Sequence, residues 1–281
     1  MKESVKEKMN RTVTAAAPSP QLVKALQGTS FRFGGMSRKP RLVVDVTARE
    51  GRGKTHFAFT APDPILYCYT DHGHEGVIEK FKGKVIGRAG YNVGADAYEI
   101  NNAQKRAALA EKEWARFYHD LRTALESGVK TIVLDTASEF YELLRFARFG
   151  KLDQVPQMLY GAVKREWMDL IRLVYDDDAP TTNLILLHKA KKEYKREKGQ
   201  DRGDWTGGYE RQGFDDDGYL VQAGLWLEHD EDAKGVKTGK TIGTISKCRD
   251  DRTKVGDTLL DPTFAELAEY VTGISEEKWF A

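Results

Sequence analysis

Four residues in the stretch 48–55, A-R-E-G-R-G-K-T, have the types and the spacing that phosphate chemistry needs. Gly51 and Gly53 allow a close approach of main-chain N–H groups to an anion, which a Cβ would block. Lys54 can then reach the β- and γ-phosphates of a nucleotide, and the hydroxyl of Thr55 can ligate Mg²⁺. The pattern predicts a phosphate-binding loop.

The residues on either side of this loop favour the same prediction. Residues 42–46, L-V-V-D-V, are typical of a buried parallel strand, and a helix beginning at Thr55 would place its positive dipole beneath the anion. The motif G-x-x-x-x-G-K-[ST] is imperfect because Ala48 occupies its first position, so an incidental turn between a strand and a helix is the alternative. The residues expected around ATP are Glu50, Gly51, Arg52, Gly53, Lys54, Thr55 and His56.

Acidic residues follow two further apolar runs. The run 131–134, T-I-V-L, ends in Asp135, which we expect to hold Mg²⁺ opposite the hydroxyl of Thr55. The run 65–69, I-L-Y-C-Y, is followed by Asp71 and Glu75, and ligands of open α/β sheets bind at the carboxyl ends of strands. Either carboxylate could polarise the attacking water, or could cap a short helix over residues 77–81.

A third apolar run, residues 183–187, leads to His188 and then to a long polar stretch. We expect His188 beside the γ-phosphate, the alternative being a histidine that is satisfied at the rim of the sheet. The polar stretch reads as a long loop that mixes basic side chains with aromatic rings, the combination that binds single-stranded nucleic acid. A solvated charged face is the alternative. The residues expected on DNA are Lys189, Lys191, Lys192, Lys195, Arg196, Trp205 and Tyr209.

The remaining elements must position these groups. Apolar residues at helical spacing predict a helix over 103–126, another around residues 140–147, one over 163–174 and a last one over 264–271. Two strands, 219–227 and 240–247, are expected to form a hairpin at the end of the sheet. Residues 1–40 are predicted to be a flexible extension with a short helix over 21–26, and residues 41–281 a single catalytic domain.

Composition limits the kinds of partner and the cellular compartment that we expect for the chain. The chain has 281 residues and a formal net charge of +1, so a nucleic-acid surface would have to be local. Its two cysteines, Cys68 and Cys248, cannot build a disulfide framework, which fits a reducing cytosol. No apolar run has the length of a membrane span and no signal-peptide core is present, so we expect a cytoplasmic protein without a membrane partner.

The order of these features resembles the ATPase core of the RecA superfamily, and in particular the small phage-encoded RecA-like ATPases ("AAA domain" proteins) associated with single-strand annealing and recombination. The resemblance is carried by G-R-G-K-T-H-F-A, Asp71 with E-G-V-I-E-K-F, T-I-V-L-D-T and L-L-H-K-A-K-K-E-Y, and it covers residues 41–271. It implies an α/β fold, a RecA-like P-loop NTPase core whose mostly parallel sheet is flanked by helices and ends in an antiparallel hairpin.

The resemblance also implies roles for individual residues. The family's usual catalytic glutamate would fall at Gly73, which leaves Asp71 or Glu75 as the acid. Lys247 and Arg249 resemble the Lys/Arg pair that related enzymes insert into the site of a neighbouring subunit, the alternative being an exposed strand end. Such head-to-tail contacts build rings or filaments. The basic break Arg145, Arg148 and Lys151 would match a second DNA-facing loop.

These inferences predict an ATPase that is stimulated by single-stranded DNA and acts in phage recombination, replication or repair in the host cytoplasm, with a single-strand binding or annealing protein as a further partner. A P-loop kinase acting on a small molecule or nucleotide is one alternative. A nucleotide-gated DNA-binding module with little hydrolysis is another. ATP turnover measured with and without single-stranded DNA separates the three.

Overall fold

The computed structural model describes residues 19–25, 27, 39–92, 102–151, 155–176, 181–195, 203–214 and 216–280. The chain divides into two units after Lys39, and the second unit, Pro40–Ala281, contains the sheet and the helices that pack against it. In the first unit the structure describes one helix, α1 (Pro20–Ala25), which overlaps the helix expected over residues 21–26. The predicted flexibility of the extension falls mainly on residues outside the described ones.

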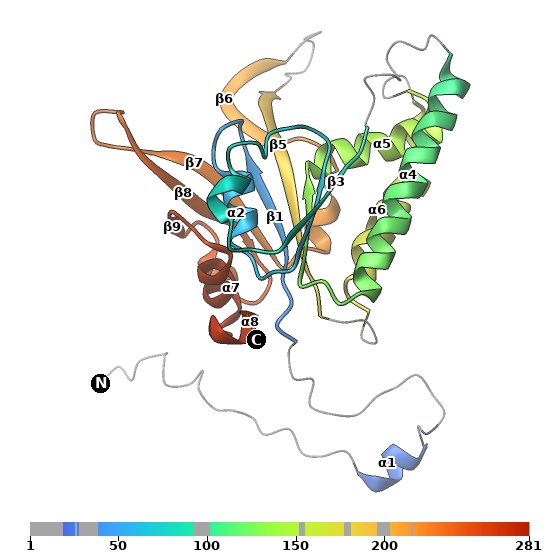
Figure 1. The fold of residues 1–281 in the computed structure, drawn as a ribbon, viewed down its shortest axis with the longest axis horizontal. Helices are drawn as coiled ribbons and strands as arrows, with labels where there is room; N and C mark the ends of the chain where they lie inside the picture. The colour runs from blue at the N-terminus through green and yellow to red at the C-terminus, as the bar shows by residue number, and fades with distance from the viewer. Residues whose placement is uncertain are drawn as a thin grey trace. The chain divides into compact units, whose positions relative to one another are not determined.

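The second unit is built on one mixed sheet whose strands follow the order β3-β2-β4-β5-β1-β7-β8-β9, with β6 pairing only with β5 (Figure 1). Neighbouring strands from β3 to β7 are parallel, while β8 and β9 are antiparallel additions. This confirms the predicted mostly parallel sheet with antiparallel strands at its C-terminal end. The strands are β1 (Val43–Ala48), β2 (Ile65–Tyr69), β3 (Ile86–Gly90), β4 (Thr131–Asp135), β5 (Asn183–Lys195), β6 (Asp204–Arg211), β7 (Ala223–Glu231), β8 (Lys237–Cys248) and β9 (Thr258–Leu260).

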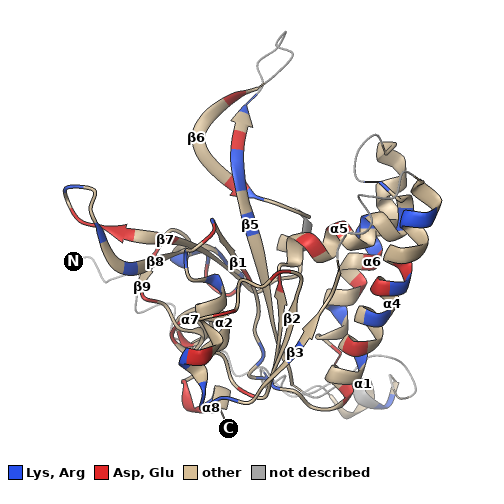
Figure 2. Cartoon of the chain, turned by 45° about the horizontal axis from the view of Figure 1, so that its top comes forward, with Lys and Arg blue, Asp and Glu red and all other residues tan. Residues whose placement is uncertain are grey.

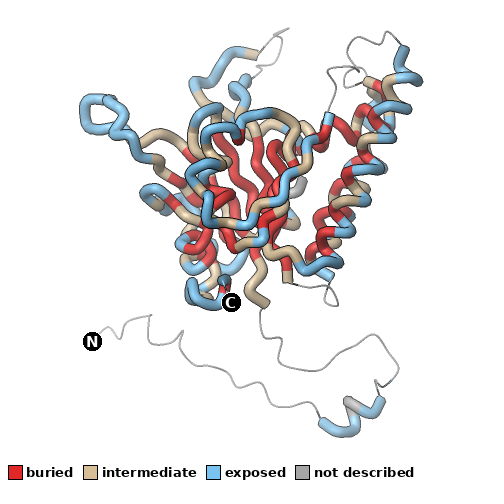
Figure 3. Tube along the Cα trace, viewed as in Figure 1, coloured by how far each residue is buried: buried red, intermediate tan, exposed pale blue. Residues whose placement is uncertain are grey.

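Helices cover both faces of the sheet. One core forms between the sheet and α4 (Ala103–Glu126), α5 (Ala137–Phe149) and α6 (Tyr160–Leu173). The other core forms against α2 (Lys54–Phe59), α7 (Phe264–Thr272) and α8 (Glu277–Phe280). Along β1, Val43 joins the first core while Val44 and Val46 join the second, and all six residues of this strand are buried. Figure 3 shows the buried residues gathered in the strands and on the helix sides that face them.

The prediction of a long loop after His188 is wrong. Strand β5 continues past this residue to Lys195 and pairs with β6 as an antiparallel hairpin, here called the β5–β6 ribbon (Ala190–Lys195 and Asp204–Arg211). Both faces of the ribbon are largely solvent-exposed, so its strands need no apolar alternation and hydrophobic patterning could not reveal them. Figure 2 shows the ribbon projecting beyond the rest of the sheet, with basic residues along β5.

Two smaller expectations also change. Arg145 and Arg148 lie inside α5 and do not form a break, because this helix continues to Phe149 and ends at Gly150, whose φ of 65° suits a left-handed helix cap. The short helix expected over residues 77–81 is a single 3₁₀ turn, η2 (Ile78–Phe81). The C-terminal hairpin is present as β7 and β8, and because β7 ends later and β8 begins earlier than expected, its turn is shortened to residues 232–236. Within the described part of the chain, no helix combines the length and the apolar character that crossing a membrane requires.

Candidate active site

The loop between β1 and α2 has the backbone that its sequence predicts. Gly51 and Gly53 adopt φ angles of 71° and 88°, in the left-handed region that favours glycine. Ala48 is the last residue of β1, buried and paired with Lys189 of β5 and Leu227 of β7. Among the described residues other than glycine, only Asp261 has a positive φ, so the position of Ala48 does not call for glycine. This accounts for the departure from the motif.

Lys54 lies across its own loop. Its Nζ donates hydrogen bonds to the carbonyl oxygens of Ala48 (3.0 Å) and Arg49 (3.2 Å). Burial lowers the pKa of Lys54, while the charges of Asp135 and Asp71 raise it. The ammonium group therefore has main-chain partners that a more strongly charged phosphate could replace.

Thr55 and Asp135, the two residues expected to hold Mg²⁺, contact each other. The Thr55 hydroxyl donates a hydrogen bond to Oδ2 of Asp135 (2.9 Å), and the Tyr67 hydroxyl donates to the same oxygen (2.6 Å). Burial raises the pKa of Asp135, against the lowering effect of these hydrogen bonds. Tyr67, which sequence patterning did not single out, thus orients the carboxylate from the middle of β2.

The donor set fits Mg²⁺, which takes hard oxygen ligands from one or two carboxylates and completes its shell with phosphate and water. Thr55 and Asp135 supply a hydroxyl and a carboxylate within 2.9 Å of each other. The part of the chain that the structure describes contains no group of three or more His, Cys, Asp or Glu residues arranged for a metal. A metal ion at Asp135 would therefore depend on oxygen atoms from the nucleotide.

The two acids expected near the attacking water have different surroundings. Asp71 is half-buried and its Oδ1 accepts a hydrogen bond from the N–H of Gly73 (2.9 Å), while its charge acts on Lys54. Glu75 is 74% exposed, and its Oε1 lies 3.5 Å from Nδ1 of His72. Of the two, Asp71 is the acid that lies within electrostatic range of the loop lysine.

A third carboxylate, Glu139, lies at the same edge and was missed in the sequence. It forms an ion pair with Lys189 and accepts a hydrogen bond from the hydroxyl of Thr70. Burial lowers the pKa of Lys189, but the ion pair with Glu139 outweighs burial and raises this pKa above its ordinary value. Glu139 lies four residues after Asp135, in the first turn of α5, and this closeness in the chain is the one sequence signal that could have drawn attention to it.

Lys189 therefore does not lie in the DNA-facing loop predicted for it. It pairs with Ala48 at the end of β1, and its charge lowers the pKa of Lys54. The preceding residue, His188, is 1% exposed, and its Nδ1 lies 3.5 Å from the hydroxyl of Ser138. Burial holds the pKa of His188 well below its ordinary range, so the imidazole is neutral at pH 7. His188 belongs to the interior of the sheet and not to its rim.

The other residues expected around the nucleotide, Glu50, Arg52 and His56, differ in exposure and in contacts. Glu50 is exposed. Arg52 places its Nε 3.9 Å from Glu228 of β7. The ring of His56 meets Phe81 edge-on at 5.0 Å between centroids, and burial lowers the pKa of His56.

The β5–β6 ribbon carries its aromatic residues beside basic ones. The Nζ of Lys192 lies 5.0 Å from the ring centroid of Trp205, and the ring of Tyr209 lies 6.3 Å from that of Trp205. Below Tyr209, the guanidinium of Arg49 lies 4.6 Å from the ring centroid and pairs with Glu228 at 2.8 Å. Arg49 thus joins the ribbon to the phosphate-binding loop.

The remaining ribbon residues differ in their contacts. Lys191 forms an ion pair with Glu210 at 3.2 Å, and Lys195 is exposed at the end of β5. Arg196 lies outside the described residues.

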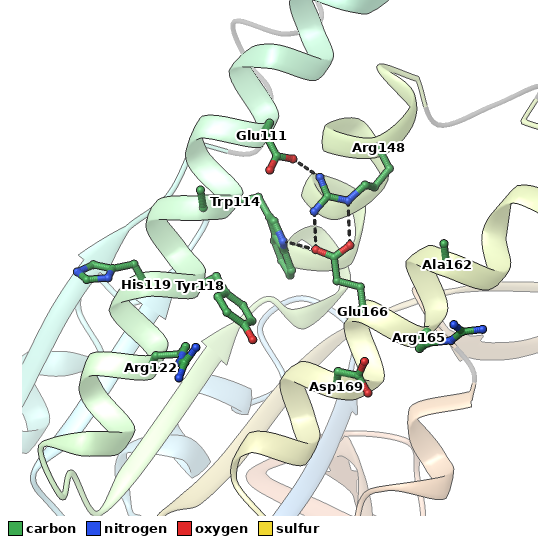
Figure 4. A pocket seen from close by; sticks show the side chains of 11 residues that line it. Glu111, Trp114, Tyr118, His119, Arg122, Arg148, Ala162, Arg165, Glu166 and Asp169 are labelled. Carbon is green, nitrogen blue, oxygen red and sulfur yellow. Dashed lines mark hydrogen bonds and ion pairs between the residues drawn. The ribbon is translucent and has the colours of Figure 1, made fainter.

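Arg145, Arg148 and Lys151 lie on the helical side of the molecule. Arg148 donates a hydrogen bond from Nε to Glu166 (2.8 Å) and also pairs with Glu111. Arg148, Glu111 and Glu166 border a pocket of about 640 Å³ between α4, α5 and α6 (Figure 4). Arg145 donates to the hydroxyl of Tyr160 (2.9 Å), and Lys151 follows the cap of α5. The carboxylates around Arg148 occupy the donors that a DNA phosphate would use.

Lys247 and Arg249 lie at the sheet edge opposite Lys54. Strand β8 runs antiparallel to β7, so its end lies beside the beginning of β7, level with the beginning of β1. The N–H of Arg249 bonds to the carbonyl of Gln222 (2.8 Å), whose own N–H bonds to Val43 (2.7 Å). This geometry places Arg249 at the edge of the sheet away from the loop between β1 and α2 of its own chain.

Comparisons with known proteins find no relative by sequence and only a distant likeness among solved structures. No protein-family model matches the chain, and a search of curated proteins finds no relative. Among solved structures, a match is the subject of "Structural and biochemical analysis of a prototypical ATPase from the type III secretion system of pathogenic bacteria", with a TM-score of 0.39 and 14% identity. The alignment covers 66% of this chain and 51% of that one, about half of its length.

Proposed function

We propose that this chain binds ATP together with Mg²⁺ at the loop 48–55 and hydrolyses it. The observation that carries the proposal is the hydrogen bond between the Thr55 hydroxyl and the buried Asp135 carboxylate, beside a lysine held on its own loop carbonyls. When bound, Mg²⁺ would neutralise charge on the β- and γ-phosphates, held by Thr55 and Asp135. Lys54 would exchange its carbonyl partners for phosphate oxygens, and the N–H groups of Gly51 and Gly53 would face the anion.

We further propose that the β5–β6 ribbon binds single-stranded DNA and that this binding stimulates hydrolysis. Trp205 and Tyr194 are 50% and 59% exposed, and basic side chains lie next to them, as stacking of bases and neutralisation of phosphates require. The contact of Arg49 with Tyr209 provides a direct connection from the ribbon to the phosphate-binding loop. These features favour a DNA-dependent ATPase in recombination, replication or repair over a kinase.

We also propose head-to-tail self-association. Lys247 and Arg249 lie at the edge opposite Lys54, so they could complete a phosphate site only in another copy of the chain. A single-strand binding or annealing protein would be a further partner on the DNA.

One assay tests nucleotide and DNA together, namely phosphate release from MgATP with and without oligothymidine. We expect oligothymidine to increase the rate for the unaltered chain and Lys54→Ala to lose about 10²-fold of it. Trp205→Ala should weaken the response to DNA, because one stacked base contributes about 1 to 3 kcal/mol, roughly 5- to 150-fold in affinity. Tyr219→Ala removes an aromatic ring that is 77% exposed outside the ribbon and is the matched control.

The outcomes separate the two parts of the proposal. If the unaltered chain neither binds nor hydrolyses ATP, the nucleotide proposal is wrong. If it hydrolyses ATP but oligothymidine has no effect at low salt, only the DNA proposal is wrong.

A further inference from the structure

Glu139 is held by two residues, one following β2 and one on β5, the two strands on either side of β4. The Thr70 hydroxyl, just beyond β2, donates to one carboxylate oxygen, and the Lys189 ammonium, on β5, pairs with the other. The same Thr70 oxygen accepts a hydrogen bond from the N–H of Thr136 (3.2 Å), next to Asp135. Glu139 is therefore fixed at the carboxyl edge of three adjacent strands, where ligands of open α/β sheets bind.

This edge is also the edge of the phosphate-binding loop. Lys189 lies opposite Ala48, the last residue before the loop, and its charge acts directly on Lys54. A triphosphate whose β- and γ-phosphates lie on Lys54 would bring its negative charge close to Lys189. The side chains of Lys189 and Glu139 are 37% and 22% exposed, so a nucleotide and a water molecule can approach them.

We propose that Glu139 is the carboxylate that orients and activates the attacking water, and that Lys189 restrains it until a triphosphate is bound. The inference rests on the ATP hydrolysis proposed above. The water oxygen forms a bond to the γ-phosphorus, while the bond from that phosphorus to the β–γ bridging oxygen breaks and leaves its electron pair on ADP. The proton released by the water passes to Glu139 and then to the inorganic phosphate.

The two other acids near the loop suit this task less well. Glu75 is 74% exposed and lies beside His72. Asp71 uses Oδ1 to bind the N–H of Gly73 and so stabilises its own turn. Glu139 has a longer side chain, and one of its two anchors is a cation that a phosphate can attract away.

The release of Glu139 follows from competition between anions for one cation. A γ-phosphate carries more negative charge than a carboxylate and forms strong hydrogen bonds with an ammonium group. Once Lys189 turns to the phosphate, Glu139 keeps its bond to Thr70 and gains a free oxygen for water. Without a γ-phosphate the ion pair remains, so ADP should leave Glu139 restrained. In this scheme Lys189 is a positioning residue for Glu139 and a discriminator between ATP and ADP.

The test compares variants of the full chain for binding of fluorescent mant-ATP and mant-ADP with Mg²⁺, and for phosphate release from MgATP. Glu139→Gln should keep mant-ATP binding, at equal or higher affinity because Lys189 is set free, and lose about 10²- to 10⁴-fold in phosphate release. Lys189→Met should weaken mant-ATP about tenfold or more, the value of a hydrogen bond to a charged group, with little change for mant-ADP. Glu126→Gln, which removes an exposed carboxylate at the end of α4, is the control, and Glu139→Asp tests whether a shortened carboxylate retains part of the rate.

The outcomes distinguish this inference from the function on which it rests. Full turnover in Glu139→Gln, with Asp71→Asn inactive, would overturn the assignment while leaving ATP hydrolysis intact. Equal weakening of mant-ATP and mant-ADP by Lys189→Met would overturn the role of Lys189, since a merely structural lysine would not distinguish the two nucleotides. Absence of ATP binding and turnover in the unaltered chain would overturn the proposed function and this inference with it.

Discussion

Arg211 anchors the base of the β5–β6 ribbon to the centre of the sheet, and its replacement should reveal how strongly. Its Nη1 pairs with Oδ2 of Asp45 in the middle of β1 at 2.7 Å, and its Nη2 donates to the carbonyl of Phe214 (2.9 Å). The two charged side chains are only 16% and 12% exposed. Arg211→Met keeps the apolar stem of the side chain and leaves the carboxylate of Asp45 buried without its nearest cation.

Removing one partner of a buried ion pair costs about 3 to 5 kcal/mol in the free energy of unfolding. Lys247 also acts on Asp45, so we expect the lower end of this range, about 3 kcal/mol. For a domain of this size that corresponds to a fall in Tm of about 6 to 12 °C. Arg172→Met is the matched control, because its ion pair with Asp169 is 51% and 55% exposed and should contribute less than about 0.5 kcal/mol.

The loss of stability in Arg211→Met should be larger at higher pH. Burial raises the pKa of Asp45, and Arg211 lowers it, so Arg211→Met raises the folded-state pKa further above the unfolded value. Between these two values the folded state binds more protons, and the stability of the variant therefore falls as the pH rises. Thermal unfolding at about pH 5 and pH 7.5 should show the larger loss at pH 7.5. A loss no larger than that of Arg172→Met, or one that grows on acidification, would refute the reasoning.

Two further predictions concern the loop and the sheet interior. Gly51→Ala and Gly76→Ala place a Cβ at φ angles of 71° and 79° with no atom within 4 Å, so each should lose about 1 to 2 kcal/mol of stability from backbone strain alone. Only Gly51→Ala should also weaken mant-ATP binding, and equal affinities in the two variants would contradict the loop assignment. Because burial depresses the folded-state pKa of His188, its contribution to stability is present above about pH 6.5 and lost as the pH falls. His188→Gln should therefore flatten the fall in Tm between about pH 7.5 and pH 5.5, and unchanged acid sensitivity would show that another group is responsible.

The elements that the sequence predicted well are those specified by local signals. The helix expected over residues 103–126 forms between the same bounds, because a regular apolar stripe coincides with an N-cap: the side chain of Asn102 accepts hydrogen bonds from the N–H groups of Gln104 (2.9 Å) and Lys105 (3.1 Å). The positions of Lys54 and Asp135 also follow from local signals, because Asp135 ends β4 and Lys54 follows β1 after the glycine-containing loop 49–53.

The features that were missed depend on contacts between distant parts of the chain. Glu139 gains its partners from Thr70 and Lys189, which are 69 and 50 residues away along the sequence. The β5–β6 ribbon is stabilised by main-chain pairing and by rings packed on cations, so its polar sequence gave no periodic signal. Arg145 and Arg148 suggested a break because they are charged, yet an amphipathic helix carries such side chains on its outer face without interruption.

The position of Lys189 connects the two proposed sites through one strand. Strand β5 is continuous from the core at Asn183 to the ribbon at Lys195, with Lys189 beside the phosphate-binding loop and Lys192 three residues further on against Trp205. At the foot of the ribbon, the N–H of Gln212 bonds to the carbonyl of Lys189 (2.7 Å). A strand paired with a neighbour along its length transmits a displacement more directly than a loop does, because its backbone has few alternative conformations. If a γ-phosphate draws Lys189 away from Glu139, the ribbon is therefore the neighbouring element best placed to respond, and DNA held on the ribbon would in turn favour one partner of Lys189 over the other.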